Sequence, residues 1–252
     1  MNVIMSSMGN DSLALIQWAK ESGLQDVTVL YNNTGWAKPL WSDRVEEAEN
    51  WINQIGYRFA QTTGEGFMDL VRRKKAFPRQ GMQFCTEHLK RIPSLEWMDV
   101  NAPKGSAVYV GVRRAESENR KDWPEYMEAS LDHGGRPLHA PLATYTDEMR
   151  NSLLDRAGWA VLPHRSMECY PCINSNRADF RALDEDRIAL IDVFETEMGV
   201  GVRSGKPKFM FRPYRHQGAK GIRNVVQWAN DGKYIEGQED FFGSGCDGGF
   251  CE

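Results

Sequence analysis

The stretch Asn2–Ala19, NVIMSSMGNDSLALIQWA, contains the pattern from which the fold of this chain can be predicted. Its apolar run at 2–5 is typical of a buried strand, and the apolar residues from Leu13 onward recur at helical spacing. Between these two patterns lie small, polar and acidic residues, and Gly23 can close the helix as a C-terminal cap. The stretch therefore predicts a strand, a tight turn and an amphipathic helix in direct succession.

The same alternation of strand-like and helix-like patterns continues over about the first 145 residues. Further strands are expected at 26–33, 57–62 and 106–112, and further helices at 41–56, 66–76 and 86–99. Strand–helix units joined by short turns favour a parallel sheet with helices on both faces. We therefore expect a doubly wound, mostly parallel α/β fold.

The pattern changes after residue 145. Helical patterns at 146–157 and 177–197 flank a pair of cysteines, and the segment from about 200 is rich in glycine, aromatic and charged residues. We expect an α/β domain at 1–145 and a helical, cysteine-containing C-terminal extension at 146–252 that packs on it.

Composition limits the class of protein. A hydrophobic fraction of 41% with 11% aromatic residues is enough for a packed core and argues against disorder. The net charge of -4 is too small to indicate a nucleic-acid partner by itself. No apolar run reaches the roughly 18 residues of a membrane span, and no secretory signal is recognisable. We expect a cytoplasmic protein without a membrane partner, whose five cysteines are ligands, nucleophiles or core residues rather than disulfides.

The turn after the first strand is suited to phosphate. Ligands bind at the carboxyl ends of the strands in such sheets, where backbone N–H groups and a helix N-terminus face the ligand. Ser7, Gly9 and Ser12 supply hydroxyl groups and a flexible backbone. Asp11 would repel phosphate unless it caps the helix or holds Mg²⁺. Ordinary helix capping by these residues is the alternative interpretation.

Four motifs in order extend this interpretation through a resemblance. Ser7–Ser12 resembles the SGGxDS loop of the PP-loop ATP pyrophosphatase superfamily, also called adenine nucleotide alpha hydrolases. YNNTGWAKPL (31–40), FCTEHLKRIP (84–93) and GVRRAESENR (111–120) resemble three successive motifs of its phosphoadenosine phosphosulfate (PAPS) reductase branch. The resemblance covers about 1–175 and implies an enzyme that binds ATP, APS or PAPS. Met8, Asn10 and Asn33 depart from the usual glycine, lysine and acidic residue.

The resemblance and the chemistry of the turn together define a set of expected nucleotide-binding residues. Guanidinium groups bind phosphate bidentately, so Arg113 and Arg120 are also expected to neutralise phosphate charge in catalysis, with Glu116 orienting one arginine. A solvated cluster of surface charges is the alternative. The expected binding residues are Ser7, Gly9, Asn10, Asp11, Ser12, Asn33, Thr34, Gly35, Lys90, Gly111, Arg113, Arg114, Glu116, Ser117 and Arg120.

The cysteines indicate metal or sulfur chemistry. Cys169 and Cys172 form a C-x-x-C pair, which suits zinc, an iron–sulfur cluster or a dithiol. Resemblance to the APS reductase and DNA-phosphorothioation branches implies a 4Fe–4S cluster with Cys85, Cys169 and Cys172 as ligands and the fourth ligand open. Structural zinc, and a disulfide or free thiols, are the alternatives. Cys246 and Cys251 lie in a glycine-rich tail. Because PAPS reductases carry a nucleophilic thiol on such a tail, both cysteines are candidate catalytic residues.

These observations support three functional hypotheses. The first is a PAPS-reductase-like enzyme that carries out sulfur redox or transfer on an adenine nucleotide, with a thiol reductant or a sulfur-donor protein as partner. The second is an ATP pyrophosphatase that adenylates and thiolates a nucleic acid, held by the basic and aromatic segment 206–223. The solvated face of a hairpin is the alternative interpretation of that segment. The third is a catalytically silent regulator that binds a nucleotide or a metal.

Overall fold

The computed structural model describes residues 1–79, 81–202, 204–211 and 220–231, which divide into two compact units. The described part of the first unit is Met1–Phe67 with Cys85–Tyr170, and that of the second is Met68–Phe84 with residues from Pro171 onward. The expected division into a domain at 1–145 and an extension at 146–252 stays a prediction.

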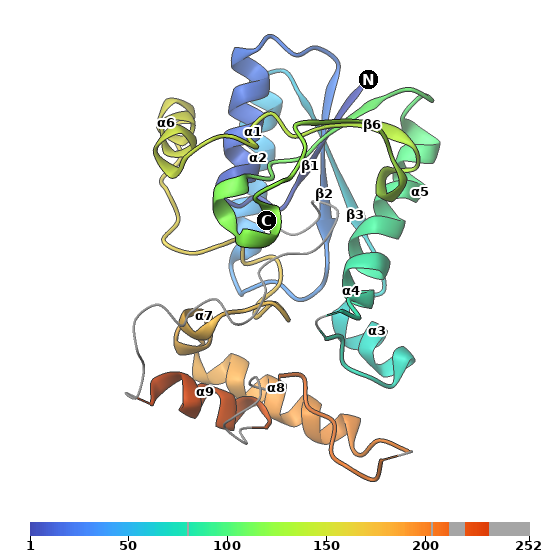
Figure 1. Cartoon of the computed structure of the whole chain (residues 1–252), viewed down its shortest axis with the longest axis vertical. Coiled ribbons are helices and arrows are strands. Elements are labelled where there is room, and N and C mark those ends of the chain that lie inside the picture. The colour runs from blue at the N-terminus through green and yellow to red at the C-terminus, as the bar shows by residue number, and fades with distance from the viewer. Residues whose placement is uncertain (80, 203, 212–219, 232–252) are drawn as a thin grey trace. The chain divides into compact units, whose positions relative to one another are not determined.

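The first unit is built on a six-stranded sheet with the strand order β3-β2-β1-β4-β6-β5 (Figure 1). All neighbouring strands pair in parallel except β5, which runs antiparallel to β6. β1 lies between β2 and β4, so the order of the strands reverses next to it. The doubly wound, mostly parallel α/β fold is therefore confirmed. The strands are β1 (Asn2–Ser6), β2 (Val27–Asn33), β3 (Arg58–Thr63), β4 (Ala107–Tyr109), β5 (Tyr126–Ser130) and β6 (Arg136–His139).

Helices cover both faces of this sheet. α1 and α2 lie on one face and α5 lies on the other, while α6 packs beside α1 (Figure 1). The helices of this unit and at its boundaries are α1 (Asn10–Glu21), α2 (Trp41–Gln54), α3 (Phe67–Lys74), α4 (Phe84–Thr86), the π-helix η1 (Glu87–Arg91), α5 (Ile92–Asn101) and α6 (Asp147–Ala157). Short 3₁₀ turns occur at η2 (Arg114–Glu116), η3 (Glu118–Arg120) and η4 (Leu131–His133).

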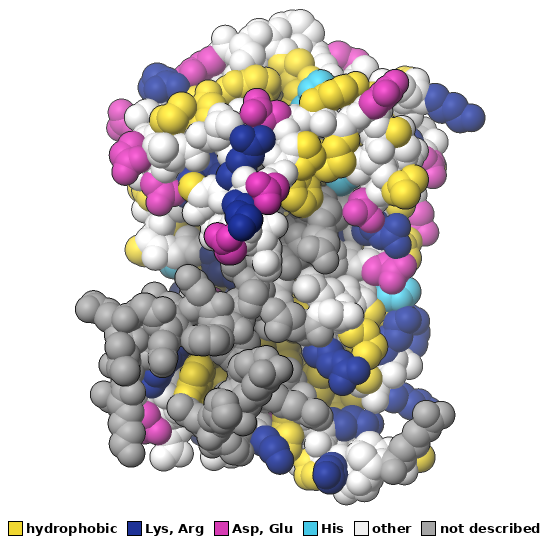
Figure 2. All heavy atoms as spheres, viewed as in Figure 1, with side chains coloured by type: hydrophobic (Ala, Val, Ile, Leu, Met, Phe, Trp, Pro, Cys, Tyr) yellow, Lys and Arg dark blue, Asp and Glu magenta, His cyan; other side chains and the backbone are white. Residues whose placement is uncertain are grey.

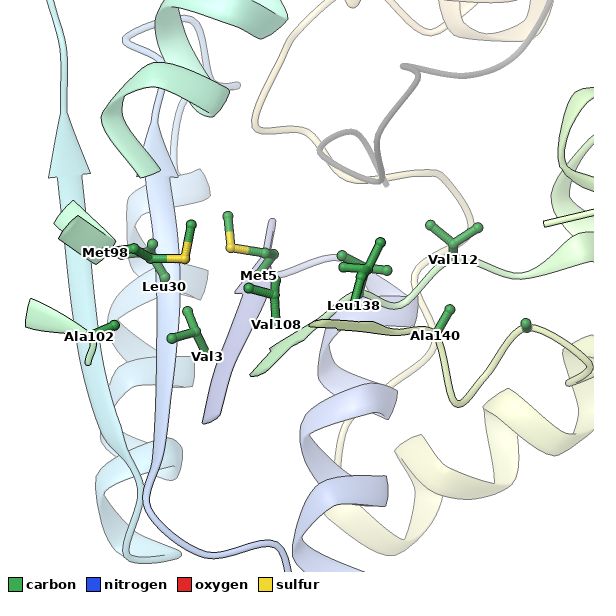
Figure 3. Close-up of a cluster of buried hydrophobic side chains, with 11 residues drawn as sticks. Val3, Met5, Leu30, Met98, Ala102, Val108, Val112, Leu138 and Ala140 are labelled. Carbon is green, nitrogen blue, oxygen red and sulfur yellow. The ribbon is translucent and has the colours of Figure 1, made fainter. Parts of the chain in front are cut away.

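The core between the sheet and α5 follows the twofold alternation of the strands. Val3 and Met5 of β1 point to this side, where Leu30 of β2 and Val108 of β4 join them (Figure 3). Met98 of α5 covers them and is fully buried. Burial of each such side chain contributes about 1.5–3 kcal/mol relative to exposure, so the central strands are firmly fixed. The loops that follow these strands therefore leave a rigid edge.

The second unit is helical, with α7 (Arg177–Arg181), α8 (Glu185–Met198) and α9 (Ile222–Asn230). The carboxylate of Glu195 is buried and accepts hydrogen bonds from the backbone N–H groups of Met210 (2.8 Å) and Ile222 (2.9 Å). Phe211 is buried and packs edge-on against Phe180, with ring centroids 4.9 Å apart. This aromatic residue of segment 206–223 is thus a core residue and not a stacking surface.

Several elements differ from expectation. β5, β6 and α9 were not foreseen, and β4 is shorter than the strand expected at 106–112. The helix expected at 86–99 is widened into η1 before Pro93, because a proline ring clashes with the carbonyl four residues earlier. Within the described part of the chain, no helix combines the length and the apolar character that crossing a bilayer requires.

Candidate functional site

Three of the predicted motifs meet at one edge of the sheet. β1 pairs in parallel with β2 and with β4, so the carboxyl ends of these strands point the same way. The segments 7–12, 33–35 and 111–120 follow these three ends. The reversal of strand order lies between β1 and β4, and ligands of open α/β sheets bind at such a point.

The turn at 7–12 is closed by its own serine side chains. Ser7 donates its backbone N–H to Oγ of Ser12 at 3.0 Å, and the two hydroxyl oxygens lie 3.2 Å apart. Gly9 is the N-cap of α1 and supplies no side-chain hydrogen bond to the helix. The first N–H groups of an α-helix have no partner within the helix and carry its positive dipole end. The turn therefore presents a helix N-terminus at the carboxyl edge of the sheet.

Met8 keeps the backbone conformation that a glycine would adopt. Its φ of 59° lies in the left-handed region, and its side chain is fully buried. Burial of the methionine offsets the cost of this conformation, which is about 1–2 kcal/mol for a residue with a Cβ atom. With Met8 in place of the usual glycine, the turn keeps a left-handed backbone at this position and gains a buried side chain that fixes it.

Arg44 of α2 holds the same turn from outside. Its Nε donates to the backbone oxygen of Met8 at 2.8 Å, and its Cζ lies 5.7 Å from the ring centroid of Trp41 and 4.9 Å from that of Trp159. Burial lowers the pKa of Arg44 from its ordinary value. Within the described residues, its Nη2 atom is buried and has no hydrogen-bond partner. A buried guanidinium donor is therefore available beside the turn.

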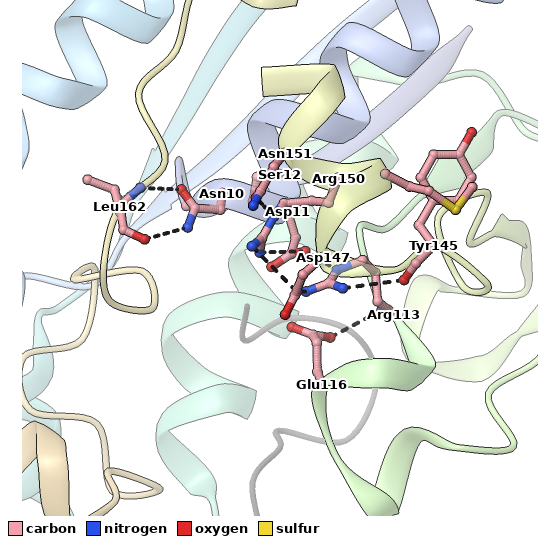
Figure 4. A network of polar contacts seen from close by, with 12 residues as sticks. Asn10, Asp11, Ser12, Arg113, Glu116, Tyr145, Asp147, Arg150, Asn151 and Leu162 are labelled. Carbon is pink, nitrogen blue, oxygen red and sulfur yellow. Dashed lines mark hydrogen bonds and ion pairs between the residues drawn. The ribbon is translucent and has the colours of Figure 1, made fainter. Parts of the chain in front are cut away.

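A later segment, 159–168, packs against the turn. Ser166 donates its hydroxyl to the backbone oxygen of Ser7 at 3.1 Å. The side-chain amide of Asn10 exchanges two hydrogen bonds with the backbone of Leu162, at 2.9 and 3.0 Å (Figure 4). A Cβ atom on Gly9 would lie 3.0 Å from Cβ of Ser166. Glycine is needed at this position because the two segments approach so closely.

Asp11 is engaged by arginines. Its carboxylate forms an ion pair with Nε of Arg113 and lies 3.5 Å from Nη1 of Arg150 (Figure 4). Arg113 also pairs with Asp147 at 2.9 Å and donates to the backbone oxygen of Tyr145 at 3.3 Å. Gly9, and not Asp11, is the N-cap residue of α1, and Asp11 lies in the first turn of the helix. Its arginine partners explain how a carboxylate is accommodated at a turn that suits phosphate.

The rest of segment 111–120 forms a second set of charged contacts. Glu116 accepts a hydrogen bond from the backbone N–H of Arg113 at 3.1 Å and forms an ion pair with Arg120. Both arginines are buried, whereas Arg114 is about one-third exposed and donates to the backbone oxygen of Trp123 at 2.9 Å. Ser117 has a buried hydroxyl that finds no hydrogen-bond partner among the described residues. The arginines of the predicted basic motif therefore have acceptors in the fold, of which Glu116 lies within the motif and the others lie outside it.

The loop after β2 is joined to the segment that carries Cys169. Glu168 accepts a hydrogen bond from the N–H of Thr34 at 2.7 Å and one from the hydroxyl of Tyr31. Burial raises the pKa of Glu168 to about 8, although the Thr34 hydrogen bond acts in the opposite direction. The N–H of Gly35 donates to the side chain of Asn33 at 2.9 Å. Asn33, Thr34 and Gly35 thus form a local turn that is fixed by a buried carboxyl group.

Lys90 lies in the π-helix η1 and is buried. Its neighbour in the fold, Ser94 of α5, donates its hydroxyl to the side chain of Asn32 at 3.0 Å. The segment that resembles the Cys-Thr-x-x-x-Lys-x-x-Pro motif therefore packs on the end of β2. π-turns of this kind occur frequently at functional sites.

The three predicted metal ligands are divided between the two units, with Cys85 and Cys169 in the first and Cys172 in the second, and their role as cluster ligands stays a prediction. Cys85 lies in α4, and Sγ of Cys169 is 3.9 Å from Oγ1 of Thr34. Sγ of Cys172 accepts a hydrogen bond from the backbone N–H of Asn174 at 3.5 Å. No group of three or more histidine, cysteine or acidic side chains that could hold a metal occurs among the described residues. Cys246 and Cys251 lie outside the described residues.

Comparisons with known proteins give likenesses in sequence and in structure. No family model matches the chain. An uncharacterised 37.8 kDa protein from the gpa 5' region of Escherichia phage 186 is 27% identical over 163 residues, which cover 58% of this chain. The matched region is 47% of that protein, so the chain spans about half the length of this relative. A crystal structure of PAPS reductase from Candida auris in complex with phosphate superimposes with a TM-score of 0.46 and 11% identity, covering 64% of this chain and 75% of that one.

The sequence analysis missed four charged residues of this region: Arg44, Asp147, Arg150 and Glu168. Arg44 and Arg150 lie in helices that the apolar spacing predicts. The helical repeat fixes which face of each helix carries the arginine, but that this face is turned to the site is known only once the packing of the helix is known. Glu168 directly precedes the C-x-x-C pair. An acidic residue directly before a C-x-x-C pair could have been proposed as a site residue from the sequence.

Proposed function

We propose that this chain binds an adenine nucleotide at the carboxyl edge of its sheet, with the phosphate groups at the turn 7–12. The observation that carries the proposal is the turn itself. It leads from the central strand β1 directly into α1, whose N-cap Gly9 supplies no side-chain acceptor to the first N–H groups. Such a helix N-terminus favours an anion through its N–H donors and its dipole.

Cationic side chains around the turn add to this preference. Nε of Arg44 holds the backbone of Met8, and its buried Nη2 has no acceptor among the described residues. Arg113 and Arg150 lie beside Asp11 in the first turn of α1. Charge-assisted hydrogen bonds to phosphate are roughly twice as strong as neutral ones. Arginines from three separate elements are thus in position to orient a nucleotide phosphate.

The proposed activity is sulfur redox or sulfur transfer on the bound nucleotide, as a PAPS/APS-reductase-like oxidoreductase or sulfurtransferase. It is supported by the four ordered motifs and by the position of Cys169, whose sulfur lies next to Thr34 at the end of β2. Thiolate sulfur is the nucleophile in such reactions, and Cys246 and Cys251 are proposed to supply it. In the redox reaction a thiol reductant would then reduce the disulfide formed by these cysteines and restore the dithiol, whereas in sulfur transfer a sulfur-donor protein would deliver the sulfur atom as a persulfide.

The proposal includes no step on a metal. No group of three histidine, cysteine or acidic side chains that could hold a metal is found among the described residues, and Asp11, the candidate Mg²⁺ ligand, pairs with arginines. Anaerobic purification followed by iron, zinc and sulfide analysis tests the cluster separately. Iron and sulfide in equal amounts would establish the cluster, and stoichiometric zinc would favour a structural zinc site. If neither iron nor zinc is found, both the cluster and the zinc site are excluded.

One observation favours the nucleic-acid hypothesis as a second candidate. Arg72, Arg73, Lys74 and Lys75 are consecutive exposed cations at the end of α3, and Lys and Arg side chains gather on the face of the second unit seen in Figure 2. Arg72 is compensated by Glu197 at 2.6 Å and Asp69 at 2.8 Å. Binding of single-stranded DNA or RNA that weakens with salt, and that is weaker and less salt-dependent in Lys74→Gln/Lys75→Gln, would support this candidate. Salt-independent binding would exclude it.

Calorimetric titration of ATP, APS and PAPS into the full chain separates the hypotheses. Tightest binding of APS or PAPS is expected for the reductase-like enzyme, and tightest binding of ATP for the adenylating enzyme. Binding of one of these without turnover in the presence of a dithiol reductant would favour the silent regulator. If none of the three binds, the proposed nucleotide site is wrong.

A further inference from the structure

Two arginines and two aspartates from three separate elements form one charged cluster beside the turn (Figure 4). Asp11 belongs to α1, Arg113 follows β4, and Asp147 and Arg150 belong to the first turn of α6. One oxygen of Asp11 pairs with Arg113 and lies 3.5 Å from Arg150. One oxygen of Asp147 lies 2.9 Å from Arg113 and 3.4 Å from Arg150. Each carboxylate therefore bridges the same two guanidinium groups.

The members of this cluster differ in exposure. The side chains of Arg113, Arg150 and Asp11 are 4%, 11% and 12% exposed, whereas that of Asp147 is 66% exposed. Asp11 is therefore a buried partner of the arginines, and Asp147 is an exposed carboxylate that covers them. With Asp147 the four groups carry no net charge, and without it the three buried groups carry one positive charge.

The donors that Asp147 occupies are the kind that a phosphate group uses. Arginine presents N–H groups in a planar fork that matches phosphate as well as carboxylate. A phosphate oxygen at the place of the Asp147 oxygen would accept from Nη2 of both arginines. Exposed ion pairs contribute only about 0–1 kcal/mol, so Asp147 can be displaced at modest cost, whereas the buried pair with Asp11 stays.

We propose that Asp147 is an internal competitor of the substrate, which occupies the position of a nucleotide phosphate between Arg113 and Arg150 until the phosphate displaces it. This inference rests on the proposed function and adds Asp147 as a residue that sets the affinity for the phosphate. A doubly charged phosphate displaces the carboxylate, whereas a singly charged anion such as sulfate ester or acetate competes poorly. The cluster thereby selects for phosphate groups of high charge.

The experiment is calorimetric titration of ATP and of sodium pyrophosphate into the full chain, its variant Asp147→Asn and its variant Asp155→Asn. Asp155 is an exposed residue of the same helix, so its variant makes the same charge change away from the arginines. Asp147→Asn is expected to bind both ligands about two- to fivefold more tightly than the unmodified chain, while Asp155→Asn is unchanged. Arg150→Gln is expected to weaken binding of both.

Three results would overturn the inference. Equal tightening by Asp147→Asn and Asp155→Asn would show a general effect of charge, and unchanged or weaker binding by Asp147→Asn would show that Asp147 does not compete. In both cases ATP binding by the unmodified chain would leave the proposed function standing. Absence of ATP and pyrophosphate binding in all variants would remove the proposed function as well. A second variant, Asp147→Ser, with an unfolding midpoint measured for each protein, controls for damage to the start of α6.

Discussion

At Met8 we expect substitution by glycine to destabilise the protein less than substitution by alanine. The side chain is fully buried, and the backbone φ of 59° is left-handed. Truncation of a buried methionine to alanine costs about 2–5 kcal/mol. Met8→Ala is therefore expected to lower the free energy of unfolding by about that amount, since alanine loses the burial and keeps the strained backbone.

Met8→Gly removes the same side chain but also removes the backbone strain. Glycine recovers about 1–2 kcal/mol in the left-handed region and loses about 0.5–1 kcal/mol through the greater entropy of the unfolded chain. The glycine variant is therefore expected to be about 1 kcal/mol more stable than the alanine variant. This order is the reverse of the usual effect of glycine.

Urea unfolding followed by tryptophan fluorescence measures the difference between the two variants. Ala14→Gly is a matched control, because Ala14 is a buried residue inside α1 and should show the ordinary loss of about 1 kcal/mol. If Met8→Ala proves as stable as Met8→Gly or more stable, the left-handed turn does not exist as described. The explanation given for the departure from the glycine-rich loop would then fail.

Three further predictions concern the same unit. Gly9→Ala brings a Cβ atom to 3.0 Å from Cβ of Ser166 and so pushes segment 159–168 away from the turn 7–12. We expect calorimetry to show ATP binding about tenfold weaker. An unchanged affinity would show that the two segments can separate without an effect on binding. Arg44→Ala removes the charge-assisted hydrogen bond to Met8, so we expect the free energy of unfolding measured in urea to fall by about 1.5–3 kcal/mol. An unchanged free energy of unfolding would contradict this role of Arg44. Burial lowers the pKa of His133 from 6.5 to about 4. The contribution of the neutral imidazole to the free energy of unfolding is therefore complete above pH 6.5. It is lost at about 1.4 kcal/mol per pH unit as the pH falls from 6.5 toward 4. His133→Asn should flatten the pH dependence over that range, and an unchanged slope would refute the assignment.

The local part of the fold could be predicted from the sequence because its signals are local. The apolar run of β1 and the helical spacing of α1 lie within one short stretch, and they define both elements without knowledge of the rest. β5 was missed because its sequence YMEAS is mostly exposed, so no apolar alternation marks it. The short β4 was overextended because Val110 and Val112 are buried without belonging to the strand.

The site could be predicted only in part, for the same reason. Parallel strands bring the turns after β1, β2 and β4 to one edge whatever their side chains do, so the meeting of these motifs follows from the topology. The pairing of Asp11 with Arg113 joins residues far apart in the sequence, and no local pattern shows it. The same holds for Glu168, whose contact with Thr34 depends on how a later segment returns to β2.

The central claim is that the turn 7–12 holds the phosphates of an adenine nucleotide. The most direct test compares ATP, APS and PAPS affinity of the unmodified chain with that of Ser12→Ala, because the Ser12 hydroxyl holds the N–H of Ser7 at 3.0 Å. Ser22→Ala, at the exposed C-terminal end of α1, is the matched control. We expect saturable binding that Ser12→Ala weakens at least about tenfold and Ser22→Ala leaves unchanged. Equal affinity of all three proteins would contradict it.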